Sequence, residues 1–129
     1  MGAIINGEKI TEDKFTGDYV IYWDNVRSSD HSHAKPGIDI GSSNERRWYR
    51  IYASGWCEQG GYDESKSGLI TVSFTVPFSR SPMVFLCPVT EGDGSSATIK
   101  VNGASAITLE TFDMAKTNTG EFWIAYGTV

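Results

Sequence analysis

The sequence predicts an all-β fold, an antiparallel β-sandwich, on two observations. Short runs that alternate polar and apolar residues recur along the chain, separated by Gly, Pro, Asn and Ser, as strands and turns do. Helical periodicity is nearly absent, and its best candidate is a single turn at residues 11–15. With 129 residues, of which 40% are hydrophobic, the chain is long enough to form one domain with a packed core.

The first 46 residues are predicted to differ from the rest of the chain. GDYVIYWDNV (17–26) predicts one strand. Residues 27–46 are polar, rich in Ser and Gly and interrupted by Pro36, which predicts an irregular, extended connection. We therefore divide the chain into residues 1–46, an N-terminal strand with an extended segment, and residues 47–129, the sandwich.

Residues 47–129 contain the predicted strands of the sandwich. RWYRIYA (47–53) and WCEQGGY (56–62) form a hairpin around a Ser54-Gly55 turn. LITVSFTV (69–76) alternates strictly, so one of its faces is expected to be buried. That face carries Ile70, Val72, Phe74 and Val76.

The later strands complete the count of seven, which is typical of a sandwich or barrel. MVFLCPV (83–89) is apolar throughout, which predicts a strand covered on both faces. ATIKV (97–101) and AITLETF (106–112) flank Asn102-Gly103, a tight-hairpin signal, and EFWIAYG (121–127) is the last strand. The aromatic residues of these strands are expected in the core, although alternation does not tell which face of a terminal strand is exposed.

The turns predict where recognition takes place. In an antiparallel order the short connections at Ser54-Gly55, residues 78–82 and Gly103-Ala104 gather at one end, and the longer loops at residues 62–68, 90–96 and 113–121 gather at the other. Polar loops on a rigid scaffold often carry binding residues. The predicted binding residues are Tyr62, Asp63, Glu64, Lys66, Glu91, Asp93 and Asn118. If the short-turn end faces the ligand instead, the contacts are Ser54, Arg80, Ser81 and Asn102.

Composition excludes several classes of partner. A formal net charge of −5 argues against binding to nucleic acid or to an anionic membrane, because phosphates would be repelled. The sequence contains neither a membrane-spanning apolar run nor a signal-peptide run, so a soluble chain without membrane insertion is expected. Cys57 and Cys87 are expected as reduced, buried thiols, with one disulfide as the alternative.

No enzyme is predicted. A G-x-S-x-G motif is absent, and the histidines are limited to His31 and His33. Some acidic residues could pair as the two carboxylates of a glycosidase or as calcium ligands. Acidic surface loops supply such pairs by chance, so they do not indicate an enzyme or a calcium site. These pairs are Glu58 with Asp63 or Glu64, and Glu91 with Asp93.

His31-Ser32-His33 predicts either two solvated histidines or a metal site. In an extended segment, residues i and i+2 point to the same side, so both imidazoles would face one point. Three chains around a threefold axis would then offer six nitrogens, a set that suits iron or another divalent metal.

A family resemblance joins three of these segments. The run WYRIYASGWCEQGG (48–61), the strand TVSFTVPF (71–78) and the closing FWIAYG (122–127) resemble the C-terminal receptor-binding domain of bacteriophage tail fibres. In that family a WYRxYxxGWxEQGG hairpin is followed by a similar strand and a similar aromatic last strand. The resemblance covers residues 47–129.

The resemblance implies an H-type-lectin-like β-sandwich that forms a parallel homotrimer at a fibre tip. Such a protein is made in the host cytoplasm, belongs to the virion and binds a bacterial surface polysaccharide or protein during host adsorption. Residues 1–46 would then be a shaft end or a part that attaches to other virion tail proteins. Some phage fibre and spike tips hold iron with H-x-H pairs from three chains, and the His31–His33 pair has that form.

Two other functions are retained as alternatives. The first is a structural virion protein of a baseplate, collar or capsid decoration that does not bind a host. The second is a glycan-degrading tail enzyme, which would depend on acids such as Glu58 and Asp93.

Overall fold

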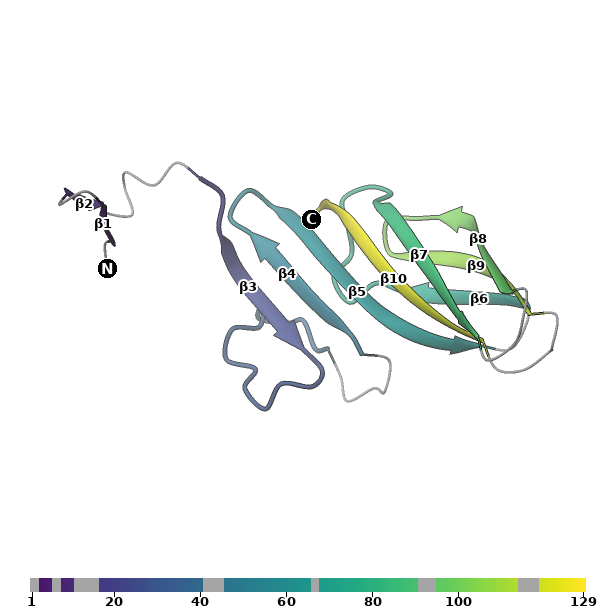
Figure 1. Ribbon diagram of the computed structural model, residues 1–129. Coiled ribbons are helices and arrows are strands. Elements are labelled where there is room, and N and C mark those ends of the chain that lie inside the picture. Colours follow the sequence, from purple (N-terminus) through teal and green to yellow (C-terminus); the bar gives the residue numbers. More distant parts are fainter. Residues whose placement is uncertain are drawn as a thin grey trace.

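The computed structural model describes residues 3–5, 8–10, 17–40, 46–65, 68–90, 95–113 and 119–129. Every regular element in these ranges is a β-strand (Figure 1). The strands are β1 (Ala3–Ile5), β2 (Glu8–Ile10), β3 (Val20–Asn25), β4 (Trp48–Tyr52), β5 (Trp56–Ser65), β6 (Gly68–Ser73), β7 (Met83–Thr90), β8 (Ser95–Asn102), β9 (Ala106–Asp113) and β10 (Thr119–Thr128). All strand pairs are antiparallel, so the predicted all-β antiparallel fold is confirmed.

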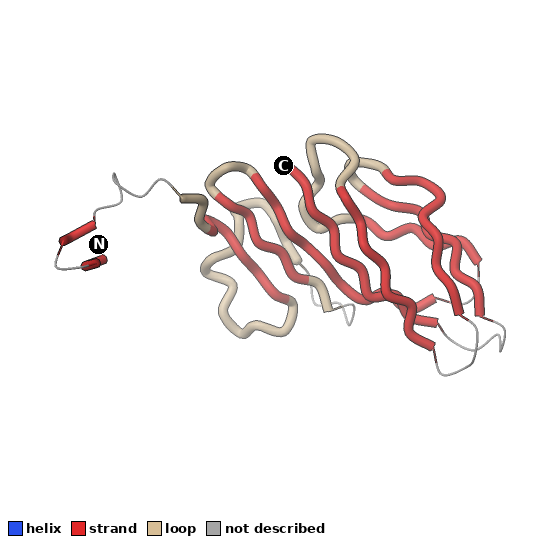
Figure 2. The backbone as a smooth tube through the Cα atoms, turned by 45° about the horizontal axis from the view of Figure 1, so that its top comes forward, coloured by secondary structure: helices blue, strands red, loops and turns tan. Residues whose placement is uncertain are grey.

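The strands from β3 onward form two sheets, as expected of a β-sandwich. The larger sheet has the order β3-β4-β5-β10-β7, and the smaller one has the order β6-β9-β8. Figures 1 and 2 show the smaller sheet at the β7 side of the larger sheet, while β3 and β4 extend beyond it. The last strand of the chain, β10, therefore lies inside the larger sheet, between β5 and β7.

The core lies between the inner faces of the two sheets. Its buried members from the larger sheet are Tyr49, Ile51, Cys57, Trp123 and Ala125, and those from the smaller sheet and its flanks are Val72, Phe74, Val76, Phe78, Ile107 and Leu109. The inner face predicted for residues 69–76 is therefore confirmed, although β6 itself ends at Ser73.

Gln59 joins the two layers through the backbone. Its side chain is fully buried, its Nε2 donates to the carbonyl oxygen of Val76 at 2.6 Å, and its Oε1 accepts from the Val76 N–H at 3.1 Å. The amide thus satisfies both backbone groups of one residue, as a neighbouring strand would. This explains why a polar residue stands in the middle of a core strand.

Residues 26–40 close the inner side of β3 and β4. The Lys35 N–H donates to the Tyr49 hydroxyl at 3.0 Å, and Ile40 is buried in the core. On the edge of β3 that faces away from β4, the Trp23 N–H donates to the His33 carbonyl at 3.0 Å. The predicted connection is irregular, as expected, but between residues 26 and 40 it folds back onto the sheet instead of extending away from it.

β3 and β4 belong to the same sheet. Trp23 pairs with Arg50 and Asn25 pairs with Trp48, so the sheet continues across the predicted boundary at residue 47. The assignment of residues 1–46 to a shaft or an attachment part stays a prediction.

Two hairpin turns differ from their sequence signals by one residue. The Gly55 N–H donates to the Tyr52 carbonyl at 2.9 Å, so Ala53 and Ser54 are the central residues, and Gly55 follows with φ of 86°. Such a left-handed conformation favours glycine. In the β8–β9 hairpin, Asn102 is still part of β8 and the turn begins at Gly103.

A short hairpin near the N-terminus was not predicted. Residues 3–5 (β1) pair with residues 8–10 (β2), and the pairing flanks the Asn6-Gly7 dipeptide. Asn-Gly is a strong hairpin signal that could have identified it. The predicted helical turn at residues 11–15 lies outside the described residues.

Both cysteines are free thiols. Cys57 is buried, and this burial raises the pKa of its thiol to about 12, so the group stays protonated and unreactive. Cys87 is exposed on β7. The prediction of two buried thiols is therefore correct for Cys57 and wrong for Cys87.

Candidate functional site

The outer face of the larger sheet, which points away from the core, is unusually aromatic. Because side chains alternate along a strand, every second residue of β3, β4, β5, β10 and β7 faces outward. The outward aromatic residues are Trp23, Trp48, Tyr52, Trp56, Tyr62, Phe122, Tyr126 and Phe85. A soluble sandwich does not need these rings for its own core, so this face is the main candidate for binding.

The Trp48 indole can lie flat on the outer face because its neighbour in the sheet, Gly60 of β5, has no side chain. A Cβ atom at Gly60, the partner of Trp48 in the sheet, would lie only 2.8 Å from Nε1 of the indole. The missing side chain therefore lets the indole lie against the backbone of β5. The first glycine of the EQGG motif thus positions an aromatic ring on the outer face.

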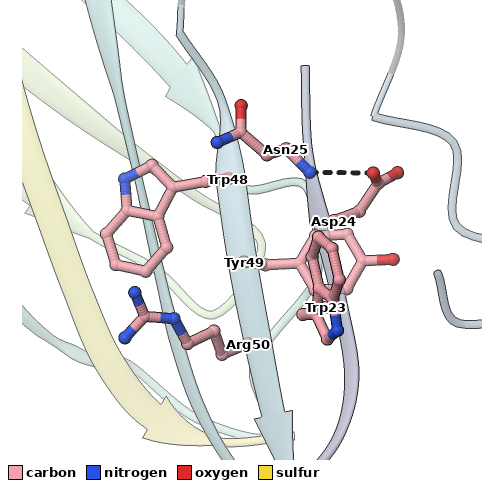
Figure 3. A pocket seen from close by; sticks show the side chains of 6 residues that line it. All are labelled: Trp23, Asp24, Asn25, Trp48, Tyr49 and Arg50. Atoms are coloured by element: carbon pink, nitrogen blue, oxygen red, sulfur yellow. Dashed lines mark hydrogen bonds between the residues drawn. The ribbon is translucent and has the colours of Figure 1, made fainter. Parts of the chain in front are cut away.

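A hollow of about 270 Å³ lies beside this indole, and we call it the Trp48 hollow (Figure 3). It is lined by Trp23, Asp24, Asn25, Trp48, Tyr49 and Arg50. The side chains of Asp24 and Tyr49 are buried on the opposite face, so these two residues contribute mainly backbone. Figure 3 shows the Trp48 indole face-on, with the Asn25 amide at one end and the Arg50 guanidinium at the other.

The polar groups of the Trp48 hollow are held in place. The guanidinium carbon of Arg50 lies 5.3 Å from the centroid of the Trp48 ring, and Nη1 lies 3.8 Å from Oε2 of Glu58. The Tyr52 hydroxyl donates to the same Glu58 oxygen at 3.4 Å. Trp23 stacks on the His33 ring, with centroids 4.9 Å apart. The hollow therefore combines aromatic rings with a cation and an amide, and the carboxylate of Glu58 holds the cation from outside the lining.

Tyr62, a predicted receptor contact, belongs to a second aromatic cluster on the same face. Its ring lies 4.8 Å from that of Phe122, and the Arg46 guanidinium carbon lies 5.2 Å from the Tyr62 centroid. Gly120 leaves the space that the Tyr62 ring occupies. Tyr62 is half-buried and stays a candidate contact, as part of a strand instead of a loop.

β7 exposes a strip of apolar side chains. It is an edge strand of the larger sheet, and its outward residues Met83, Phe85, Cys87 and Val89 are exposed, with Phe85 reaching 57%. The prediction that this strand is covered on both faces is therefore wrong for a single chain. An exposed apolar strip of this kind is typical of a surface that contacts another protein.

Asp63 was predicted to lie in an exposed loop, but this prediction is wrong. It is buried in β5, where Oδ1 accepts from Arg47 Nη2 at 3.0 Å and Oδ2 accepts from Trp123 Nε1 at 2.7 Å. Arg47 also donates to the Ser73 carbonyl at 3.0 Å and lies 4.8 Å from the Trp123 ring centroid. Asp63 is thus part of a polar network inside the sandwich and is not placed to contact a receptor.

The side chains of the other predicted long-loop contacts are outside the described part of the structure. Lys66, Glu91, Asp93 and Asn118 lie outside the described residues, and for Glu64 the structure describes the backbone of β5. The strand ends that border these loops do gather at one end, because residues 65 and 90 both pair with residue 119.

The short turns gather at the opposite end, as predicted. The Ser79 N–H donates to the Thr128 carbonyl at 2.8 Å, and the Ser81 hydroxyl donates to the Asn102 carbonyl at 2.7 Å. Ser54 donates its hydroxyl to Asp18 at 2.5 Å, and Arg80 is exposed. Three of the four alternative contacts therefore hold turns together within the protein.

His31 and His33 do not converge on one point. His31 Nδ1 lies 2.6 Å from Oδ1 of the buried Asp24, whereas His33 stacks on Trp23. Asp24 and Trp23 are consecutive residues of β3 and point to opposite faces of the sheet. These residues do not fit the expected metal site, because both rings would have to leave their partners. Among the described residues, no three His, Cys, Asp or Glu side chains lie close enough to hold a metal ion together.

One of the candidate carboxylate pairs, Glu58 with Asp63, does not face a common point. Glu58 lies on the outer face of β5 and Asp63 on the inner face. Glu121 of β10, which pairs with Asp63, is fully buried, and within the described ranges neither oxygen of its carboxyl group has a hydrogen-bond partner. Desolvation raises the pKa of Glu121 to about 7.

No family model, curated protein or solved structure matches the chain. Within the described ranges, the chain contains no helix that is long and apolar enough to span a membrane.

Proposed function

We propose that this protein is a receptor-binding protein of a bacteriophage tail fibre, which recognises a surface glycan or another receptor of a bacterium during host adsorption. The observation that carries the proposal is the aromatic outer face of the larger sheet, with the Trp48 hollow at one side and the Tyr62–Phe122–Arg46 cluster at the other. Aromatic rings flanked by a few fixed polar groups are characteristic of sites for small organic ligands.

The family resemblance of residues 47–129 supports the same function. The motif residues have separable roles in the sandwich: Gln59 joins the layers, Gly60 accommodates Trp48, and Trp123 binds Asp63. The motif therefore combines core residues with residues that shape the outer face. In this proposal the protein binds without catalysis and belongs to the virion.

The proposed protein acts as an H-type-lectin-like homotrimer. The apolar strip of β7 supports self-association, because burial of such a strip is favourable and three copies of a weak site bind with avidity. The same strip would also suit a different virion protein, which is the observation that favours a structural virion role as the second candidate. Light scattering during size-exclusion chromatography distinguishes a trimer from a monomer.

Fluorescently labelled protein, added to a broad panel of bacteria and to a glycan array, tests the proposed function. We expect labelling of a subset of strains and of a related set of glycans. If all strains and all glycans remain unlabelled while the protein is folded and trimeric, the structural virion role is favoured instead. Release of reducing sugar from host polysaccharide would instead support the enzyme.

A further inference from the structure

Trp48 offers a flat apolar surface of the size of one sugar ring. Its indole is supported from beneath by the glycine backbone at Gly60. The π face of an indole carries partial negative charge, which attracts the weakly positive C–H groups on one face of a pyranose. The adjacent hollow of about 270 Å³ is slightly below the range of sites for drug-sized ligands, so it suits a single ring.

Hydrogen-bond donors lie at both ends of this surface. The Asn25 Oδ1 accepts from the Arg27 N–H at 2.9 Å, which fixes the amide and leaves its NH₂ group to donate. At the other end, the Arg50 guanidinium is more than half exposed and has N–H groups beyond the one that faces Glu58. Sugar hydroxyls at either end of a ring could accept from these two groups.

The charges of the site favour a neutral ligand. Arg50 is the cation that lines the hollow, and Glu58 lies 3.8 Å from it, so the local charges offset each other. The net charge of −5 further disfavours an anion.

From these contacts we infer that the Trp48 hollow is a binding site for a neutral hexopyranose of a surface polysaccharide. Trp48 supplies the stacking surface, Asn25 and Arg50 donate hydrogen bonds, and Glu58 holds Arg50 in place. The inference rests on the proposed glycan-binding function and specifies its site and sugar class. One ring with few contacts binds weakly, with a dissociation constant on the order of millimolar.

Nuclear magnetic resonance of the indole N–H groups tests the site directly. The probes are the methyl glycosides of glucose, galactose, mannose and rhamnose, with methyl glucuronide as the acidic probe. We expect the Trp48 signal to shift with at least one neutral glycoside, and we expect the protein to bind the glucuronide at least about tenfold more weakly. The signal of Trp123, whose N–H is bonded to Asp63, reports whether the fold is intact.

Three variants complete the test. In Trp48→Ala, the sugar is expected to shift none of the remaining indole N–H signals. Arg50→Gln is expected to weaken sugar binding about tenfold, because it removes a charge-assisted hydrogen bond. Trp56→Ala is the matched control, because Trp56 is exposed on the same face but does not line the hollow. The inference is overturned if no neutral glycoside binds, if the glucuronide binds more tightly, or if Trp48→Ala binds as the wild type does.

Adsorption of the same proteins to the bacterial panel separates the two proposals. If the wild type labels cells and Trp48→Ala labels them equally, the sugar site is wrong and the proposed function stands. If the wild type neither labels cells nor binds any glycan, both fail. Loss of labelling in Trp48→Ala but not in Trp56→Ala supports both.

Discussion

Glu121 carries a carboxyl group in a place where most proteins have an apolar side chain. It is fully buried, it has no hydrogen-bond partner in the part of the chain that the structure describes, and desolvation raises its pKa to about 7. In the unfolded chain, where water surrounds the same carboxyl group, its pKa has the ordinary value of 4.5. Below pH 4.5 both states are protonated, whereas between pH 4.5 and 7 the folded state alone keeps the proton.

Stability is therefore expected to fall as the pH rises from about 4.5 to about 7 and to remain reduced above that range. One pKa unit corresponds to about 1.4 kcal/mol, so the contribution is at most about 3 kcal/mol. Glu121→Gln removes it, and its gain in the free energy of unfolding over the wild type should be larger at pH 8 than at pH 5. Urea unfolding at both values measures this gain.

Glu110→Gln serves as the control for Glu121. Glu110 forms an ion pair with Lys100 at 2.6 Å, but both side chains are about half exposed. Exposed pairs contribute about 0–1 kcal/mol, so this variant should differ little from the wild type at either pH. An equal gain at pH 5 and pH 8 for Glu121→Gln would contradict the account of the buried carboxyl group.

Asp63 is expected to stabilise the fold and not to contact a receptor. Asp63→Asn leaves the buried Arg47 without its carboxylate, and removal of one partner of a buried ion pair typically costs about 3–5 kcal/mol. We expect a loss of this order in chemical unfolding. A variant with wild-type stability and reduced cell binding would show that Asp63 contacts the receptor after all.

At the scale of one strand, the packing of β5 against its neighbours requires glycine at position 60. A Cβ atom at Gly60 would lie 2.7 Å from the Trp123 carbonyl oxygen and 2.8 Å from the Trp48 indole. Gly60→Ala is expected to destabilise the fold by about 1–3 kcal/mol, as overpacked positions do, and to displace Trp48. Thermal unfolding together with the Trp48 indole signal measures both effects. Unchanged stability and an unchanged signal would contradict the packing described for Gly60.

β7 is the element on which self-association should depend. Phe85→Glu places a charge in the centre of the apolar strip and is expected to convert the proposed trimer into a monomer, with Cys87 then open to thiol reagents. Light scattering and the rate of thiol labelling measure the change. Leu69→Glu is the control, because Leu69 is 68% exposed on β6 of the other sheet. Loss of the trimer in both variants would contradict a role specific to β7.

Alternation along the strands predicted which elements form and which residues of β6 face the core. It did so because one face of β6 is polar, which leaves a single orientation for the strand. The pattern could not assign β7, whose residues are apolar on both faces. Continuous apolar sequence indicates burial on both sides, but it does not tell whether the second cover is the same chain or another molecule.

The candidate site was harder to predict than the strands. The prediction chose polar loops because loops commonly carry binding residues, whereas Trp48 was expected in the core as a member of a strand. The available signal was the spacing of residues 48, 50 and 52, which share one face of β4, opposite the buried Tyr49 and Ile51. Which face of β4 is covered depends on where residues 26–40 fold back onto the sheet, and no local pattern encodes that position.

At the scale of the whole molecule, the two sheets have different tasks in this account. The smaller sheet lies against the β7 side of the larger sheet and completes the core there (Figures 1 and 2). The opposite face of the larger sheet carries the exposed aromatic residues. The Trp48 hollow lies over β3 and β4, and the apolar strip lies on β7 at the opposite edge. Sugar binding and self-association can therefore occur on the same face without competing for the same strands.

Binding of the labelled protein to susceptible bacteria after selective treatment of their surface tests the central claim most directly. Periodate cleaves the vicinal diols of sugars, whereas a broad-specificity protease removes surface proteins. We predict that periodate abolishes binding, that protease treatment leaves it intact, and that Trp48→Ala fails to bind untreated cells. Binding that survives periodate and is lost after protease would contradict the claim that the outer face recognises a glycan.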